Sequence, residues 1–149
     1  MLKKRVLLIN PPSGLFVRDD RCQSNVKSFI MAIPRPPHEL ALMATILRND
    51  GCDVAIRDYP IENGSVEAFR KDLSVFKPDV LVVNATIPSL EKDVVCCSLA
   101  KKHNAEITCI LRCGAIEYCG DHIMNCFPTI YVIVYGESDY SVSEYISAK

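Results

Sequence analysis

The sequence predicts an α/β fold with an open, doubly wound sheet of five mainly parallel strands and helices on both faces, Rossmann-like or flavodoxin-like in class. Five short segments have the pattern of strands, and most of them are almost continuously apolar, as strands are when a parallel sheet is covered on both faces. Each of them is followed by a segment with a helical pattern. The chain has 149 residues and shows no repeat or interdomain linker, so we expect residues 1–149 to form a single domain.

The strands and helices follow in strict alternation. The first helix is rich in Leu, Ala and Met and stops at Asp50-Gly51, a common helix-ending pair. The second stops before Lys77-Pro78, where proline disfavours a further turn. The predicted strands are 5–10, 53–58, 80–84, 107–111 and 131–135, and the predicted helices are 38–49, 65–76, 90–103, 116–125 and 140–148.

An unusually long connection separates the first strand from the first helix. The strand runs into Pro11-Pro12, and residues 13–37 then show no helical pattern and are expected to form a loop. A long connection at the carboxyl end of a strand is more often a ligand loop than an accident. In open parallel sheets, ligands bind outside the carboxyl ends of the strands, where the strand order reverses. We therefore expect the site among the residues that follow the strands.

Composition excludes several classes of partner. The net charge is −1 and no window is strongly basic, so we expect no nucleic acid and no anionic membrane as partner. No apolar run approaches the ~18 residues that a membrane span needs. The basic and apolar amino terminus resembles a signal peptide, but Asn10-Pro11-Pro12 interrupts it and no cleavage site follows. The eight cysteines lie mostly in apolar segments, which indicates free thiols and a cytoplasmic protein.

Two common ligands of such sheets fit the strand ends poorly. Asp58 stands where a ribose-binding acid would close the second strand, but a dinucleotide site also needs a Gly-x-Gly-x-x-Gly turn. The corresponding residues 10–14 contain two prolines, which remove amides that the pyrophosphate requires. A phosphate-accepting receiver domain needs an acid after the third strand, where this chain has Asn84. No Gly-x-Ser-x-Gly or Walker sequence is present.

Segments along nearly the whole chain resemble the cobalamin-binding domain at the amino terminus of radical S-adenosylmethionine enzymes. "VLLINPP" is similar to that family's opening strand, and "PRPPHELALMATILRNDGCDVAIRDYP" to its first helix and second strand. "FKPDVLVVNATIPSLEKD" resembles the third strand with its loop, and "VIVYGESDYSVSEYI" the closing Gly-Glu and helix. Each segment is a weak signal alone, whereas their common order indicates this family.

The resemblance implies that the nucleotide tail of cobalamin enters a slot between strand ends lined by small and hydroxylated residues. The family's Ser/Thr loop corresponds to Thr86 and Ser89, and we expect Ser89 also to cap the helix that starts at Leu90. Of the family's Gly-Gly pair only the second glycine is present, because the corresponding residues are Cys113-Gly114. The predicted cofactor-binding residues are Asn10, Pro11, Pro12, Thr86, Ser89, Cys113, Gly114, Gly136 and Glu137.

The long connection also bears on how cobalt is held. Cobalamin-dependent mutases and methionine synthases carry Asp-x-His-x-x-Gly after the first strand, and its histidine coordinates cobalt. Residues 18–22 read Arg-Asp-Asp-Arg-Cys and contain no histidine. The resemblance therefore implies a loop, with residues such as Leu15, Phe16 and Val17, that lies below the corrin without donating a ligand. His38 is the nearest histidine, and we interpret it as a first-turn helix residue.

Two groups of cysteines resemble metal sites, but neither completes a shell. Cys109 and Cys113 begin a Cys-x-x-x-Cys-x-x-Cys iron–sulfur motif, in which Ile116 replaces the third thiolate. Residues 119, 122 and 126 are Cys, His and Cys on one helix face, and Cys113 could join them. These ligand types suit zinc, but one helix face cannot supply a tetrahedral shell. We predict no metal bound by the protein itself.

The resemblance thus implies a cobalamin-binding module, the amino-terminal part of a longer radical S-adenosylmethionine protein. Alone it would hold cobalamin and catalyse nothing. The parent would be a methyltransferase, with the corrin as methyl carrier and with S-adenosylmethionine and an iron–sulfur cluster in a following barrel domain, its main partner. The alternative is a doubly wound module without cofactor that serves as an interaction or sensor domain.

Overall fold

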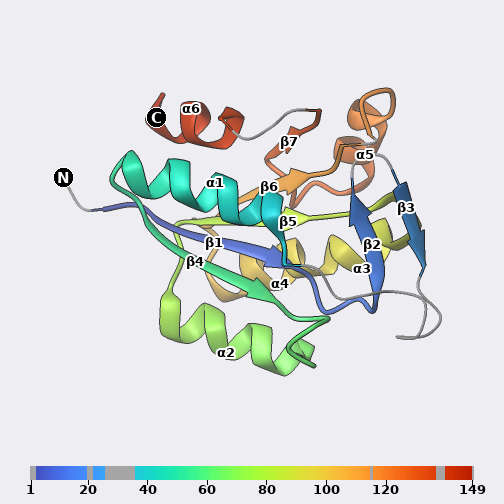
Figure 1. Cartoon of the computed structure of the whole chain (residues 1–149), viewed down its shortest axis with the longest axis horizontal. Coiled ribbons are helices and arrows are strands. Elements are labelled where there is room, and N and C mark those ends of the chain that lie inside the picture. The colour runs from blue at the N-terminus through green and yellow to red at the C-terminus, as the bar shows by residue number, and fades with distance from the viewer. Residues whose placement is uncertain (1–2, 20–21, 26–35, 115, 137–139, 149) are drawn as a thin grey trace.

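The computed structural model of the chain describes residues 3–19, 22–25, 36–114, 116–136 and 140–148. In these ranges the fold is a central sheet with helices on its two faces (Figure 1). No helix in the described ranges is long and apolar enough to cross a membrane.

The main sheet has five parallel strands, as the sequence predicts, and their order is β4-β1-β5-β6-β7. From β1 the chain first moves outward to β4, and it then returns past β1 to β5 and continues to β6 and β7. The strand order therefore reverses between β1 and β5, which is the place where such sheets bind ligands. The strands are β1 (Arg5–Asn10), β4 (Asp53–Asp58), β5 (Val80–Asn84), β6 (Thr108–Arg112) and β7 (Val132–Val134).

Helices cover both faces of the sheet. One apolar core joins the sheet to α1 and α6, and a second joins it to α2, α4 and α5. Figure 1 shows α1 and α6 on the side of the sheet opposite α2 and α4. The helices are α1 (His38–Asn49), α2 (Val66–Phe76), α3 (Leu90–Asp93), α4 (Val95–His103), α5 (Gly120–Cys126) and α6 (Ser141–Ser147).

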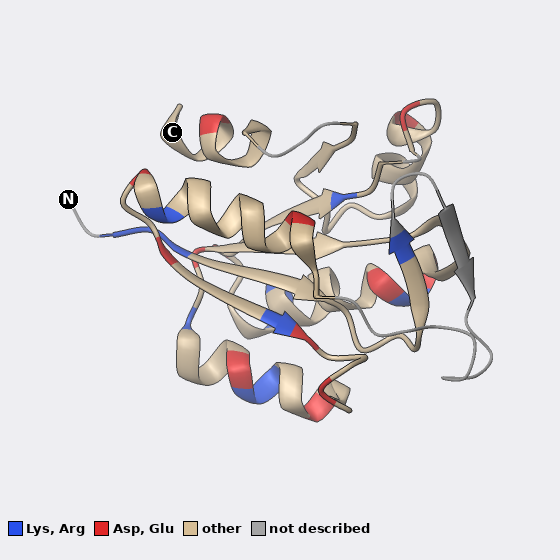
Figure 2. Ribbon diagram, viewed as in Figure 1, with Lys and Arg blue, Asp and Glu red and all other residues tan. Residues whose placement is uncertain are grey.

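The strands β1 and β5 are buried on both faces, which explains their continuous apolar sequences. In β1, Leu7 and Ile9 pack in the core of α2 and α4, whereas Val6 and Leu8 pack in the core of α1. This division follows from the period of two along a strand. Charged residues lie mainly on helices and near strand ends, and β5 carries none (Figure 2). Among the cysteines whose side chains the structure describes there is no disulfide, and Cys52, Cys96, Cys97, Cys109 and Cys113 are buried.

Two predicted helices differ from those observed. A 3-10 helix, η1 (Ile87–Ser89), precedes α3, and the predicted helix 90–103 is interrupted at Val94, where the Cys97 amide bonds to the Val94 carbonyl three residues back. The predicted helix 116–125 begins only at Gly120. Ile116 is fully buried in the core, and a turn closed by the Cys119 amide on its carbonyl leads into α5.

The expectation of a loop throughout residues 13–37 is wrong in part. Strands β2 (Phe16–Asp19) and β3 (Cys22–Asn25) form an antiparallel hairpin, a separate two-stranded sheet. Strands of four residues are too short to show a clear period in the sequence. The hairpin lies near the carboxyl ends of β1 and β5, with β3 against η1 (Figure 1).

Candidate functional site

Buried polar side chains join the carboxyl ends of three neighbouring strands. Asn84 ends β5, and its Nδ2 donates to Oδ1 of Asn10 at the end of β1, at 2.8 Å. Its Oδ1 accepts from Nη1 of Arg112, the last residue of β6, at 3.1 Å. Arg112 also forms an ion pair with Glu39 of α1. The strand ends are thus tied together by hydrogen bonds at the point where the strand order reverses.

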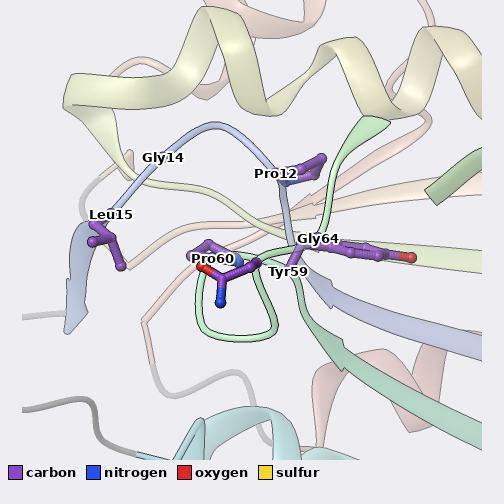
Figure 3. A pocket seen from close by; sticks show the side chains of 7 residues that line it. Pro12, Gly14, Leu15, Tyr59, Pro60 and Gly64 are labelled. Atoms are coloured by element: carbon purple, nitrogen blue, oxygen red, sulfur yellow. The ribbon is translucent and has the colours of Figure 1, made fainter. Parts of the chain in front are cut away.

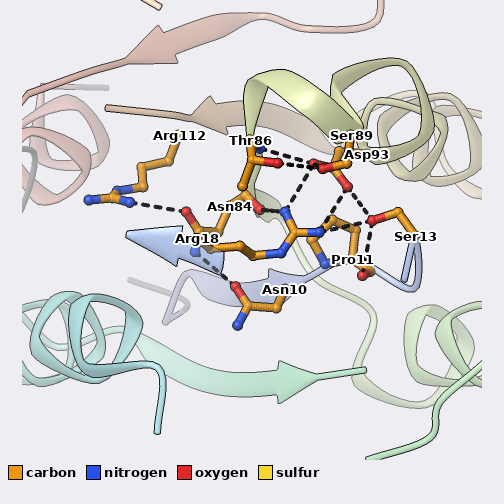
Figure 4. A network of polar contacts seen from close by, with 9 residues as sticks. All are labelled: Asn10, Pro11, Ser13, Arg18, Asn84, Thr86, Ser89, Asp93 and Arg112. Atoms are coloured by element: carbon orange, nitrogen blue, oxygen red, sulfur yellow. Dashed lines mark hydrogen bonds and ion pairs between the residues drawn. The ribbon is translucent and has the colours of Figure 1, made fainter. Parts of the chain in front are cut away.

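Arg18 of the hairpin reaches into this edge of the sheet. Its side chain is 6% exposed, and its Nη1 donates to the Asn84 carbonyl at 2.6 Å. Both terminal nitrogens bond to the carboxylate of Asp93 in α3, Nη1 to Oδ2 at 2.9 Å and Nη2 to Oδ1 at 3.1 Å. Figure 4 shows the guanidinium facing Asp93, Ser13 and Asn84. This buried, bidentate ion pair connects the hairpin to the main sheet.

Asp93 is the centre of the network, because its carboxylate is fully buried and accepts five hydrogen bonds. Besides the two from Arg18, they come from the Thr86 amide at 3.1 Å, from the Ser89 hydroxyl at 2.6 Å and from the Ser13 hydroxyl. The donors belong to the hairpin, to the turn after β1 and to the loop after β5. Such a set stabilises a buried carboxylate.

Thr86 and Ser89 lie together, as the sequence predicts, but their hydroxyls serve this network. Their oxygens are 2.7 Å apart. Ser89 directly precedes α3, yet it donates to Asp93 and makes no hydrogen bond to the first amides of the helix. The expectation that Ser89 caps this helix is therefore wrong. The Ser89 hydroxyl instead donates to the carboxylate one helical turn away, a charge-assisted hydrogen bond.

The turn after β1 is short and bends back on itself. The Ser13 amide donates to the Pro11 carbonyl at 2.8 Å, and Pro11 is buried. Two open hollows meet at Pro12. One, of about 430 Å³, lies between this turn and residues 59–64, including Tyr59 and Gly64 (Figure 3). The other, of about 380 Å³, is bounded by Ser13 and by residues of α2, α3 and α4.

Two buried polar atoms at this edge have no hydrogen-bond partner among the described residues. They are Nε of Arg18 and Oδ1 of Asp58, the last residue of β4. Burial raises the pKa of the Asp58 carboxyl, against the opposing effects of a hydrogen bond from Asn10 and of the Arg18 charge. Unsatisfied polar groups are rare in protein interiors, so they mark a place where a further polar ligand would be accommodated.

The other predicted residues lie farther along the sheet. The side chain of Cys113 is fully buried in the core, and its amide bonds to Val134 of β7. Gly114 follows it, and Gly136 follows the edge strand β7 with a φ of 67°, which favours glycine. Glu137 lies outside the described residues. The structure thus groups Asn10, Pro11, Pro12, Thr86 and Ser89 at the reversal point, with Cys113, Gly114 and Gly136 toward β7.

The main polar residues missed by sequence reasoning are Arg18 and Asp93. Seventy-five positions separate them, and each is a charged residue in a segment that looks like ordinary surface. The sequence indicates Asp58 only as a candidate ribose-binding acid, and Asn84 only as the residue at the position of a receiver's acid. The one available signal was the spacing of Ser89 and Asp93, four residues apart in a helical segment, which brings two side chains to one face.

The described ranges contain no group of three His, Cys, Asp or Glu residues arranged to hold a metal ion. Sγ of Cys126 and Nε2 of His122 are 3.6 Å apart on an exposed helix face. Cys119 is half-buried and its thiol bonds to the Ile116 carbonyl at 3.8 Å. His38 is exposed at the first position of α1, where the first-turn interpretation places it.

Comparison with known proteins shows relatives of greater length. No family model matches the chain. It is 24% identical over 144 residues to an uncharacterized methyltransferase of Pyrococcus horikoshii, a match that covers 97% of this chain and 29% of the relative. The structure of this chain resembles that of TsrM, a radical S-adenosylmethionine methyltransferase from Kitasatospora setae. The TM-score is 0.71 and the identity 15%, over 98% of this chain and 26% of TsrM.

Smaller proteins share the fold as well. A response regulator from Thermotoga maritima superposes with a TM-score of 0.61 and 13% identity, over 98% of this chain and 97% of the regulator. A CheY-like receiver domain from Methanospirillum hungatei matches with a TM-score of 0.61 and 11% identity, over 98% of this chain and 92% of the receiver. These likenesses establish the flavodoxin-like fold. The chain spans between a quarter and a third of each of the two methyltransferases.

Proposed function

We propose that this chain is a cobalamin-binding module and forms the amino-terminal part of a longer radical S-adenosylmethionine methyltransferase. The observation that carries the proposal is the position of the hydroxyl loop. Thr86 and Ser89 follow β5 at the point where the strand order reverses, and Asn10-Pro11-Pro12 ends the adjacent strand. The resemblance of the sequence to the cobalamin-binding family and the similarity to two methyltransferases support the same conclusion.

The residues at this edge suit a ligand with both apolar and amide or hydroxyl groups. Thr86, Ser89 and Asn10 would contact the nucleotide tail, and the unpartnered Oδ1 of Asp58 offers an acceptor. The hollows beside Pro12 are bordered by apolar side chains such as Leu15 and Leu99, which suit the rim of a broad apolar ring.

The role of the module is to bind and orient the cofactor. A bound corrin supplies a cobalt centre that can carry a methyl group. The chain's own residues would exclude water from the tail and present one face of the ring to a following barrel domain. That domain would hold S-adenosylmethionine and the iron–sulfur cluster, so we expect the module alone to catalyse nothing. The free thiols suit a reducing cytoplasm.

Binding of hydroxocobalamin tests the proposal. The purified protein should retain corrin absorbance through gel filtration, with an affinity that is about micromolar, or ~8 kcal/mol, because the ring lacks its covering domain. Thr86→Val keeps the shape of the side chain and removes a hydroxyl, and it should weaken binding about tenfold, or ~1.4 kcal/mol. Thr45→Val, on the exposed face of α1, is the matched control and should bind as the wild type does.

An interaction or sensor domain without cofactor is the second candidate. One observation favours it: Arg18 and Asp93 satisfy each other inside the crevice, as in a module that needs no ligand there. The fold also resembles response regulators, although Asn84 stands where a receiver needs an acid. If corrin absorbance elutes wholly at the small-molecule volume, under reducing and oxidising conditions alike, this second function replaces the first.

A further inference from the structure

We propose that the guanidinium of Arg18 occupies the position that the nucleotide tail of cobalamin takes, and that Arg18 thereby determines which corrinoids the module accepts. The inference rests on the proposed function and adds a specificity-determining residue to it. In the present conformation the Arg18–Asp93 pair keeps the tail slot closed. Entry of a tail requires Arg18 to leave.

The first argument is the position of Arg18. Its Nη1 is 2.6 Å from the carbonyl oxygen of Asn84, the last residue of β5. Asn84 is in turn bonded to Asn10 at the end of β1, so the guanidinium lies at the reversal point of the sheet (Figure 4). Ligands of doubly wound sheets enter between these two strand ends. The Arg18 side chain is 6% exposed and fills this position, so a tail can take it only when Arg18 moves away.

The second argument is the use of the two hydroxyl hydrogens. Ser89 donates its single hydrogen to Oδ2 of Asp93, at 2.6 Å. Thr86 is 2.7 Å from the Ser89 oxygen and must be the donor of that bond, because a hydroxyl has one hydrogen. Neither hydroxyl can donate to a ligand while this arrangement persists. A tail that uses them must disturb the Asp93 network, to which Arg18 contributes two bonds.

The third argument is that the present occupant fits the crevice incompletely. Arg18 Nε and Asp58 Oδ1 are buried without a partner among the described residues. The strand that carries Arg18 is also separate from the main sheet, because β2 pairs only with β3 in the described ranges. An isolated two-stranded hairpin is marginally stable in water. It can therefore leave the crevice without breaking the five-stranded sheet.

The consequence for affinity follows from the fraction of molecules with an open slot. The apparent dissociation constant equals the intrinsic one divided by that fraction. If the open form is about 1–10% populated, a range typical of minor states, removal of Arg18 should tighten binding of tail-bearing cobalamin roughly 10- to 100-fold. Cobinamide, a corrin without the nucleotide tail, does not need the slot, and its affinity should stay the same.

The test compares hydroxocobalamin and dicyanocobinamide on one pair of double variants. Arg18→Met with Asp93→Asn removes both charges, so that neither remains buried alone. Arg5→Met with Asp53→Asn is the matched control, because this exposed pair lies at the opposite, amino-terminal edge of the sheet. Hydrogen exchange of the amides in residues 16–19, without any corrinoid, reports whether the hairpin has been released.

We expect the Arg18/Asp93 variant to bind cobalamin at least tenfold more tightly, to bind cobinamide as the wild type does, and to show faster exchange in β2. Weaker or unchanged cobalamin binding despite faster exchange would overturn the inference and leave the proposed function standing. An equal gain for cobinamide would show that Arg18 obstructs the ring and not the tail. If no variant and no wild type retains cobalamin, the proposed function fails, and the inference fails with it.

A second variant covers the case in which the double variant does not fold. Arg18→Lys keeps a positive charge beside Asp93 and removes the bidentate hydrogen bonding of the guanidinium to the carboxylate. It should shift cobalamin affinity in the same direction by a smaller factor, about threefold to tenfold by the same argument on the open fraction. Loss of cobalamin affinity in Arg18→Lys would identify Arg18 as a contact of the cofactor instead, contrary to the inference.

Discussion

Asn84 and Asn10 are hydrogen-bonded side chain to side chain at the reversal point of the sheet, with Nδ2 of Asn84 at 2.8 Å from Oδ1 of Asn10. The same Asn84 amide accepts from Arg112, so one buried side chain connects the ends of β1, β5 and β6. The sequence predicts Asn10 as a cofactor-binding residue. The geometry shows that both asparagines hold the strand ends together.

Asn84→Ala should therefore lower stability as well as alter the site. It leaves Asn10 and Arg112 each without one hydrogen bond in a buried place, which should cost about 1–3 kcal/mol of the free energy of unfolding. Urea unfolding followed by circular dichroism measures this. Asn49→Ala, at the exposed end of α1, is the control and should change stability by less than about 0.5 kcal/mol. Equal effects of the two substitutions would refute the structural role of Asn84.

Gly64→Ala should destabilise the loop that borders the larger hollow. A Cβ at this position would lie 2.5 Å from Cδ1 of Tyr59, which is too close for any real contact. The Tyr59 ring cannot move aside easily, because its hydroxyl donates to Asp72 at 2.7 Å and the ring makes a T-shaped contact with that of Phe69. Overpacking of this kind costs about 1–3 kcal/mol.

Gly120→Ala is the matched control for that substitution. No heavy atom lies within 4 Å of the added Cβ at Gly120, the first residue of α5. Because alanine favours a helix over glycine, stability should stay equal or rise by up to about 1 kcal/mol. Thermal unfolding of both variants decides the point: a Gly64→Ala protein as stable as the wild type would show that Tyr59 can shift.

The pH dependence of stability should reveal the buried carboxyl of Asp58. Burial raises its pKa in the folded state, so the folded chain holds that proton more tightly than the unfolded chain does. The contribution of this group to the free energy of unfolding therefore falls as pH rises through the acidic range. Asp58→Asn removes the contribution, and the variant should gain stability relative to the wild type between about pH 4 and pH 7.

Glu67→Gln provides a control of opposite sign. A hydrogen bond from Ser65 lowers the pKa of the Glu67 carboxyl, so its contribution to stability increases with rising pH. The glutamine variant should accordingly lose stability relative to the wild type as pH rises toward the ordinary glutamate pKa of about 4.3, and the difference should stay constant above it. Urea unfolding of the two variants and the wild type, followed across these pH ranges, measures the two differences in stability. A relative gain in Glu67→Gln, or a relative loss in Asp58→Asn, contradicts the assignment of these environments.

Cobalt in the bound cofactor should carry no nitrogen ligand from the protein. His38 is exposed at the start of α1, and residues 18–22 contain no histidine. Electron paramagnetic resonance of bound Co(II) cobalamin should show no nitrogen superhyperfine splitting, and His38→Ala should leave the spectrum unchanged. A single-nitrogen triplet that His38→Ala abolishes would make His38 a ligand. A triplet that survives the substitution would show that the cofactor's own base remains attached.

Much of the fold could be predicted because its determinants are local. The segments 5–10, 53–58 and 80–84 match the observed strands at both ends. In β1 and β5, burial on both faces demands an almost continuous apolar run. Alternation with helices then restricts the topology to a parallel, doubly wound sheet. From that class, the carboxyl edge follows as the expected place of a ligand site, and the loop with Thr86 and Ser89 lies at this edge.

What occupies that edge was decided by tertiary structure. Arg18 and Asp93 are 75 positions apart, and nothing in either neighbourhood distinguishes a buried partner from an ordinary surface charge. The break at Val94 and the late start of α5 likewise depend on which side chains the finished core encloses, among them Ile116. Local pattern determines which segments can be strand or helix, because period and apolar content act over a few residues. The pairing of charges depends on distances that exist only after the strands have assembled, and the attraction between the two charges is strengthened by burial that the whole fold creates.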